Sequence, residues 1–95
     1  MKPLDKIIKK NGYTYTQVSK GKVSCIYEQM ENEKTIAYEV FLIKIKPERK
    51  IGDIILEAKE WFPHDKAFGK WAWTYKTLNK ALEKYNILEN HLSKK

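Results

Sequence analysis

Residues that could act in acid–base catalysis or bind a metal are few in this sequence. His64 and Asp65 are adjacent, and a histidine beside a carboxylate can transfer protons. No nucleophile accompanies them, and we expect Asp65 to cap a turn instead. Cys25 is predicted to be a small core residue, and Cys25, His64 and His91 lack the spacing of metal ligands. We therefore predict a protein that is not an enzyme and that has no catalytic residue, metal site or cofactor.

Aromatic and basic residues that could contact nucleic acid occur together in three places. These are Trp71, Trp73 and Tyr75 between Lys70 and Lys76; Tyr13 and Tyr15 ahead of Lys20 and Lys22; and a turn with Lys44, Lys46, Arg49 and Lys50. Aromatic rings can stack on bases for ~1–3 kcal/mol each, and lysines can follow the phosphates. The rings could instead pack in the core, and the basic turn could be a solvated hairpin tip that prevents edge-to-edge aggregation.

The net charge of +7 is distributed in bands along the chain. Residues 1–22 carry six Lys and one Asp, residues 44–50 are basic, and residues 66–95 carry seven Lys and two Glu, whereas the two intervening segments are acidic. This pattern predicts an anionic partner, either nucleic acid or a protein with an acidic surface. Only one of the 19 basic residues is Arg, which favours sequence-tolerant backbone contact over base reading.

The length of 95 residues, with 42% hydrophobic residues, predicts a single folded domain over residues 1–95. A lone cysteine indicates a reducing compartment. The N-terminal segment lacks a signal-peptide core, and the longest aliphatic and aromatic run, residues 40–43, is far shorter than the ~18 residues that span a bilayer. We therefore expect a cytoplasmic protein without a membrane interaction.

The predicted elements are mostly strands. Leu4, Ile7 and Ile8 before Asn11-Gly12 indicate either a short helix or an extended lead-in over residues 1–12. An antiparallel sheet is expected over residues 13–76, with strands at 13–18, 23–30, 35–46, 53–62 and 71–75 and an exposed hairpin tip at 47–52. Residues 53–62 would also fit a helix, but Gly52 and Pro63 bound the segment closely and favour a strand. Alternation in the last strand puts Trp71, Trp73 and Tyr75 on one face.

A C-terminal helix over residues 77–92 is the clearest element, because leucines and alanines recur at helical spacing after Thr77, a predicted N-cap. The fold class is therefore α+β, with an antiparallel sheet of four to five strands and one C-terminal helix packed on one face. Because the central strand is apolar on both faces, the second face needs a cover. We expect a ligand, strong curling of the sheet, or a homodimer through this uncovered face.

Two stretches resemble small uncharacterised proteins of tailed phages and integrated mobile elements. They are YEVF at 38–41 and FPHDKAFGKWAWTYKTLNKALEKY at 62–85, of which the FGKWAWT segment is the most specific, and the resemblance covers about residues 13–90. It implies a phage context, with the host cell cytoplasm as the expected location, and no particular activity. Small basic phage products often act as nucleic-acid accessories or as inhibitors of host proteins.

Two hypotheses follow for the function. The first is a basic, non-catalytic binding protein that contacts nucleic acid through backbone phosphates. The second is a protein-interaction module, such as an inhibitor of a host defence or nucleic-acid-processing complex, or a virion component. The candidate binding residues are the same for both: Lys44, Lys46, Arg49, Lys50, Lys70, Lys76, Tyr13, Tyr15, Trp71 and Trp73.

Overall fold

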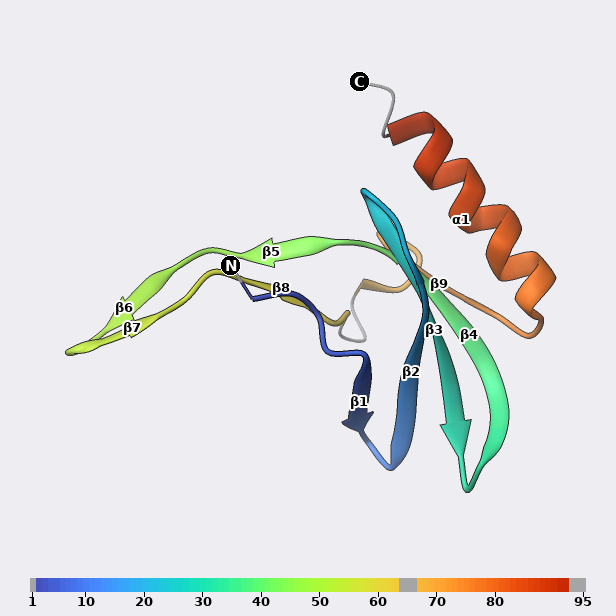
Figure 1. Cartoon of the computed structure of the whole chain (residues 1–95), viewed down its shortest axis with the longest axis horizontal. Coiled ribbons are helices and arrows are strands. Elements are labelled where there is room, and N and C mark those ends of the chain that lie inside the picture. Colours follow the sequence, from blue (N-terminus) through green and yellow to red (C-terminus); the bar gives the residue numbers. More distant parts are fainter. Residues whose placement is uncertain (1, 64–66, 93–95) are drawn as a thin grey trace.

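A five-stranded antiparallel sheet and one helix form the body of the protein (Figure 1). The computed structural model describes residues 2–63 and 67–92. The sheet has the order β1-β2-β3-β4-β9, and its strands are β1 (Ile7–Lys10), β2 (Tyr13–Lys20), β3 (Ser24–Glu31), β4 (Lys34–Leu42) and β9 (Ala72–Tyr75). Helix α1 (Leu78–Leu92) packs on the sheet, which confirms the predicted α+β class.

Residues 7–10 form a strand, so the short helix considered for the N-terminal segment is wrong. Asn11 and Gly12 have φ values of 55° and 83°, which is the geometry of a tight hairpin turn with two left-handed residues. This turn pairs Lys10 with Tyr13 and Ile7 with Thr16. Asn-Gly therefore joins two strands here and does not end a helix.

The helix covers one face of the sheet. Its buried residues Ala81 and Leu88 pack with Ile26 and Val40 of the central strands. The predicted N-cap is confirmed, because the Thr77 hydroxyl accepts a hydrogen bond from the Lys80 amide at 3.3 Å. This half of the core accounts for the apolar stripe of the helix.

The helix is also clamped to the turn between β2 and β3 by Glu89. Its carboxylate accepts hydrogen bonds from the amides of Lys22, Val23 and Ser24 at 2.8, 3.1 and 2.7 Å, and from the Ser24 hydroxyl at 2.6 Å. Burial alone would raise the pKa of Glu89, but these hydrogen bonds outweigh it and hold the pKa below its ordinary value. The clamp fixes the far end of α1 on the sheet.

The opposite face of the sheet is covered by the chain itself, which corrects the prediction that this face is uncovered. Tyr27 and Phe41 are stacked there with centroids 5.6 Å apart, and the ring of Phe62 lies within 5.4 Å of both. Leu4 and Ala67 complete this buried cluster. A helix of 15 residues covers only one face, so the N-terminal segment and the connection into β9 supply the second layer.

The chain leaves the sheet between β4 and β9 to form a long hairpin, called the arm here. The arm consists of β5 (Lys44–Lys46), β6 (Arg49–Ile51), β7 (Ile54–Leu56) and β8 (Lys59–Trp61). β5 pairs with β8 and β6 with β7 in one continuous register, from Lys44 opposite Trp61 to Ile51 opposite Ile54. Figure 1 shows the arm extending away from the sheet.

The arm confirms the choice of strand over helix for residues 53–62 but moves the predicted hairpin tip. The turn lies at Gly52-Asp53, not over residues 47–52, and Gly52 has the positive φ of 59° that the first position of a tight hairpin turn requires. Pro47, which has no N–H to donate, interrupts the pairing between β5 and β6 without reversing the chain. The predicted strand 35–46 is likewise divided between β4 and β5.

Candidate functional site

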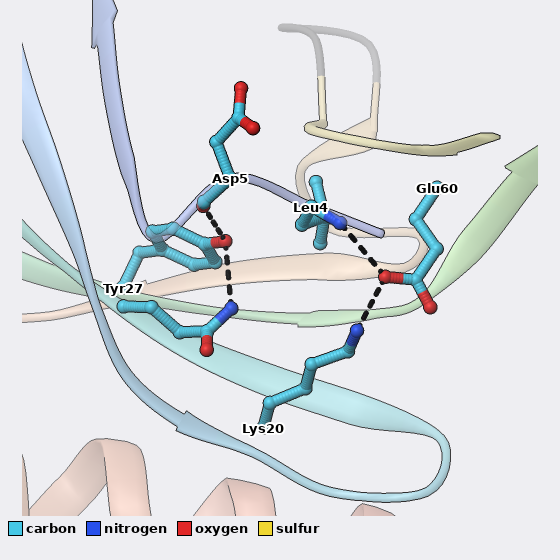
Figure 2. A network of polar contacts seen from close by, with 6 residues as sticks. Leu4, Asp5, Lys20, Tyr27 and Glu60 are labelled. Carbon is cyan, nitrogen blue, oxygen red and sulfur yellow. Dashed lines mark hydrogen bonds and ion pairs between the residues drawn. The ribbon is translucent and has the colours of Figure 1, made fainter. Parts of the chain in front are cut away.

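A polar network fixes the base of the arm against the body of the protein (Figure 2). Glu60 of β8 accepts a hydrogen bond from the Leu4 amide at 3.0 Å and forms an ion pair with Lys20 at 2.6 Å. Next to it, the Tyr27 hydroxyl donates to the Asp5 carbonyl at 2.6 Å and accepts from the Gln17 amide group. The N-terminal segment and β2 thus hold the arm, and Tyr27 of β3 holds the N-terminal segment.

The electrostatics of this network favour its ionised carboxylate. Burial alone would raise the pKa of Glu60, but the hydrogen bonds from Lys20 and Leu4 and the charge of Lys20 lower it below the ordinary value. Burial raises the pKa of Tyr27 to about 12, so its hydroxyl keeps its proton and donates. Glu60 therefore positions the arm, and Tyr27 positions the N-terminal segment beside it.

The N-terminal segment runs beside the arm and adds a cation to it. The Lys2 amide donates to the Ala58 carbonyl at 3.0 Å, and the Lys2 carbonyl accepts from the Glu60 amide at 2.9 Å. These two bonds form a parallel bridge between Lys2 and Lys59. Two lysines that are 57 positions apart in the sequence are adjacent as a result.

Four cations line a pocket where the arm bends at Pro47. They are Lys2, Lys46, Arg49 and Lys59, and the remaining lining residues are Pro47, Leu56 and Glu57. Its volume is about 210 Å³, and all the cations are exposed to solvent. Four positive charges against one carboxylate form a site for an anion such as a phosphate group. This basic pocket is the candidate functional site.

Two tryptophans adjoin the basic pocket. The rings of Trp61 and Trp71 are 5.5 Å apart, and both are half-buried. The Lys46 ammonium lies 4.9 Å from the centre of the Trp61 ring, and that of Lys44 lies 5.9 Å from the Trp71 ring. Lysines beside partly exposed indole rings combine a phosphate contact with a surface on which a base can stack.

Some of the residues predicted from the sequence come together in this region. Lys46 and Arg49 line the pocket, and Lys44 lies over the ring of Trp71 without lining it. Lys50 is farther out on the arm, opposite Ile55. The residues that were predicted to form a basic turn therefore lie in the strands β5 and β6.

The aromatic residues of the prediction are divided between the two faces of the sheet. Tyr15 is buried in the cluster around Tyr27, and Tyr13 is half-buried and packs against it, so Tyr15 occupies a core position. Trp71 packs against the same cluster, whereas Trp73 packs on the opposite face with the helix, 4.1 Å from the Lys84 ammonium. The shared face predicted for Trp71, Trp73 and Tyr75 is thus wrong, because Trp71 precedes the regular strand that begins at Ala72.

Lys70 and Lys76 lie at the two ends of β9 and are exposed. Neither of them lines the basic pocket. They extend the positive surface of the body without belonging to the candidate site.

Sequence analysis did not identify Lys2, Lys59 or Trp61 as parts of the site. Lys59 and Trp61 lie in an acidic segment, and only the hairpin register brings them opposite Lys46 and Lys44. Gly52-Asp53 was the available signal, because a turn centred there leads to this register. For Lys2 no such signal exists, since its position depends on a tertiary contact.

The remaining chemical candidates do not form a site in the described part of the chain. Cys25 is fully buried, as predicted, and burial strongly raises the pKa of its thiol. His64 and Asp65 lie outside the described residues. Within residues 2–63 and 67–92, no group of three His, Cys, Asp or Glu side chains could hold a metal ion, and no helix is long and apolar enough to cross a membrane.

Three comparisons with known proteins found no match. No protein-family model, no curated protein and no solved structure matches the chain. The site is therefore interpreted from its own geometry and charge.

Proposed function

We propose that the protein is a small, non-catalytic binding protein that contacts nucleic acid through backbone phosphates. The observation that carries this proposal is the basic pocket, where cations from three separate segments converge: Lys2 from the N-terminal segment, Lys46 and Arg49 from one side of the arm, and Lys59 from the other. Lysine and arginine side chains of this kind bind the successive phosphates of a polynucleotide backbone.

The composition of the pocket favours sequence-tolerant binding. Three of its four cations are lysines, which act as point charges and lack the planar fork with which arginine reads guanine. The half-buried rings of Trp61 and Trp71 offer stacking to any base. The ribbon shape of the arm also suits the major groove of a duplex, which admits a two-stranded β-ribbon.

Fluorescence anisotropy of labelled single- and double-stranded oligonucleotides tests the proposal over a range of salt concentrations. We expect affinity that falls linearly with the logarithm of the salt concentration. The variant K46Q/K59Q should bind about tenfold more weakly at low salt, with a slope smaller by roughly 1.8 on duplex DNA. The matched variant K34Q/K80Q removes two exposed lysines outside the pocket and should change both values much less.

Three results would contradict the proposal. One is the absence of binding at about 50 mM salt. Another is binding that does not respond to salt. The third is an equal loss of affinity in K46Q/K59Q and K34Q/K80Q, which would show that the charge acts without a defined site.

A second candidate function, a protein-interaction module or virion component, is supported by the apolar end of the arm. Ile51, Ile54 and Ile55 are 55%, 64% and 65% exposed on a segment that protrudes into solvent. Exposed aliphatic patches of this kind are typical of protein contacts. Affinity capture with wild-type bait should recover a stoichiometric partner that bait carrying I54S/I55S loses, and recovery with both baits would contradict this function.

A further inference from the structure

Two strand edges of this protein are exposed and carry aliphatic residues. β1 is the outermost strand on one side of the sheet, and its Ile7 is 61% exposed. β7 is paired only with β6, and Ile54 and Ile55 are among the most exposed large hydrophobic side chains of the described residues. An edge of this type presents backbone N–H and C=O groups to which another strand can add.

The charges that flank the two edges are opposite in sign. β1 lies in the sequence Lys6-Ile7-Ile8-Lys9-Lys10, and β7 lies in Asp53-Ile54-Ile55-Leu56-Glu57. Pairing of β1 with another β1 would bring lysines together, and pairing of β7 with another β7 would bring carboxylates together. Like charges therefore disfavour the pairing of either edge with the same edge of another copy.

We propose that β7 of one copy of this chain pairs with β1 of a second copy. Lys6 and Lys10 are four positions apart, as are Asp53 and Glu57. In either strand direction, alignment of the two segments therefore sets a lysine against a carboxylate at both ends. Between them, Ile7 and Ile8 face aliphatic residues of β7, and Lys9 lies opposite Ile54 or Leu56. The edge of β6 is the poorer match, because Arg49 and Lys50 repel the lysines of β1.

The contact must form between copies and not within one. The base of the arm is held against the N-terminal segment by Glu60, and the arm points away from β1 (Figure 1). Each copy then offers one arm and one edge, which makes the contact head-to-tail. Such contacts build a ring if the rotation closes and a filament if it does not.

Sedimentation velocity on the purified chain without nucleic acid tests this proposal independently of phosphate binding. We expect the mass to rise above the monomer value of 11.3 kDa with increasing protein concentration. D53K/E57K and K6E/K10E should each associate at least about tenfold more weakly, because like charges then face each other. An equimolar mixture of the two variants should regain association, since every edge again meets an arm of opposite charge.

Controls separate this contact from general charge effects and from misfolding. E33K/K34E exchanges two exposed charges at the turn between β3 and β4 and should associate like the wild type. I54S/I55S should lose association while keeping the circular dichroism spectrum and thermal midpoint of the wild type. A wild type that stays monomeric up to about 0.5 mM, or a mixture of charge variants that fails to associate, overturns the proposal.

Discussion

The sheet and the arm are both antiparallel, and both contain aliphatic residues, but they differ in what covers them. In the sheet, the helix packs on one face, and the N-terminal segment with residues 62–63 and 67–71 packs on the other, so Ile26, Tyr27 and Phe41 are fully buried. In the arm, all six residues of β6 and β7 are exposed. Strand formation therefore depends on local pairing, whereas burial depends on whether another segment of the chain returns to that face.

The largest contrast is expected between equivalent truncations of the two regions. F41A removes a fully buried ring that contacts Tyr27 and Phe62, and we expect a loss of ~3–5 kcal/mol in the free energy of unfolding. I55A on the arm should change it by less than about 0.5 kcal/mol. Urea denaturation measures both values, and similar losses would mean that the arm is packed in solution.

Loss of the Glu89 clamp on the helix should cause the next largest decrease in the free energy of unfolding. E89Q removes the charge that three backbone amides and the Ser24 hydroxyl bind, and we expect a loss of ~1.5–3 kcal/mol. G21A would introduce a methyl group that collides with the Glu89 carboxylate and should destabilise the protein through the same contact. The double variant should therefore lose less than the sum of the two, and full additivity in urea denaturation would contradict the clamp.

The ion pair at the base of the arm should contribute less to the free energy of unfolding, and this contribution should depend on pH. E60Q breaks the ion pair with Lys20, which is partly exposed, so a loss of about 1 kcal/mol is expected at pH 7. Because the pKa of Glu60 is lowered in the folded protein, its stabilisation is present above the ordinary value of 4.5 and is lost as the pH falls below it. The difference between wild type and E60Q, measured by urea denaturation from pH 7 to pH 3, should shrink on acidification, and a constant difference would contradict this reasoning.

The smallest effect on stability is expected at the tip of the arm. I54S should change the thermal midpoint of the isolated monomer by no more than about 2 °C, because Ile54 is 64% exposed. The same change should raise solubility, since it removes part of an apolar patch. A clear loss of stability at low protein concentration would show that the tip packs within one chain, which would remove the contrast with the sheet.

Much of the fold could be predicted from local patterns. The helix followed from the spacing of Leu78, Ala81, Leu82 and Leu88 after Thr77, and the strands followed from alternating β-branched and aromatic residues. The N-terminal helix was the exception, because Leu4, Ile7 and Ile8 fit a helical turn as well as a strand. Only pairing with β2 across Asn11-Gly12 decides between them.

The candidate site could be predicted only in part. The charge bands identified Lys46 and Arg49, since composition shows where cations are concentrated. They could not show that Lys59, in an acidic segment, lies opposite Lys46, nor that Lys2 lies beside Lys59. Local sequence does not encode register and tertiary pairing strongly, because each depends on residues far apart in the chain.

The sequence by itself determined the fold class, the excess of lysine and the positions of most strands and of the helix, because these depend on composition and on periods of two and 3.6 residues. The tertiary structure alone decided which face each aromatic residue occupies, that residues 62–63 and 67–71 help to cover the second face of the sheet, and that the cations meet in one pocket. These features arise from contacts between distant segments, and a chain of 95 residues can satisfy the same local patterns with several arrangements of such contacts.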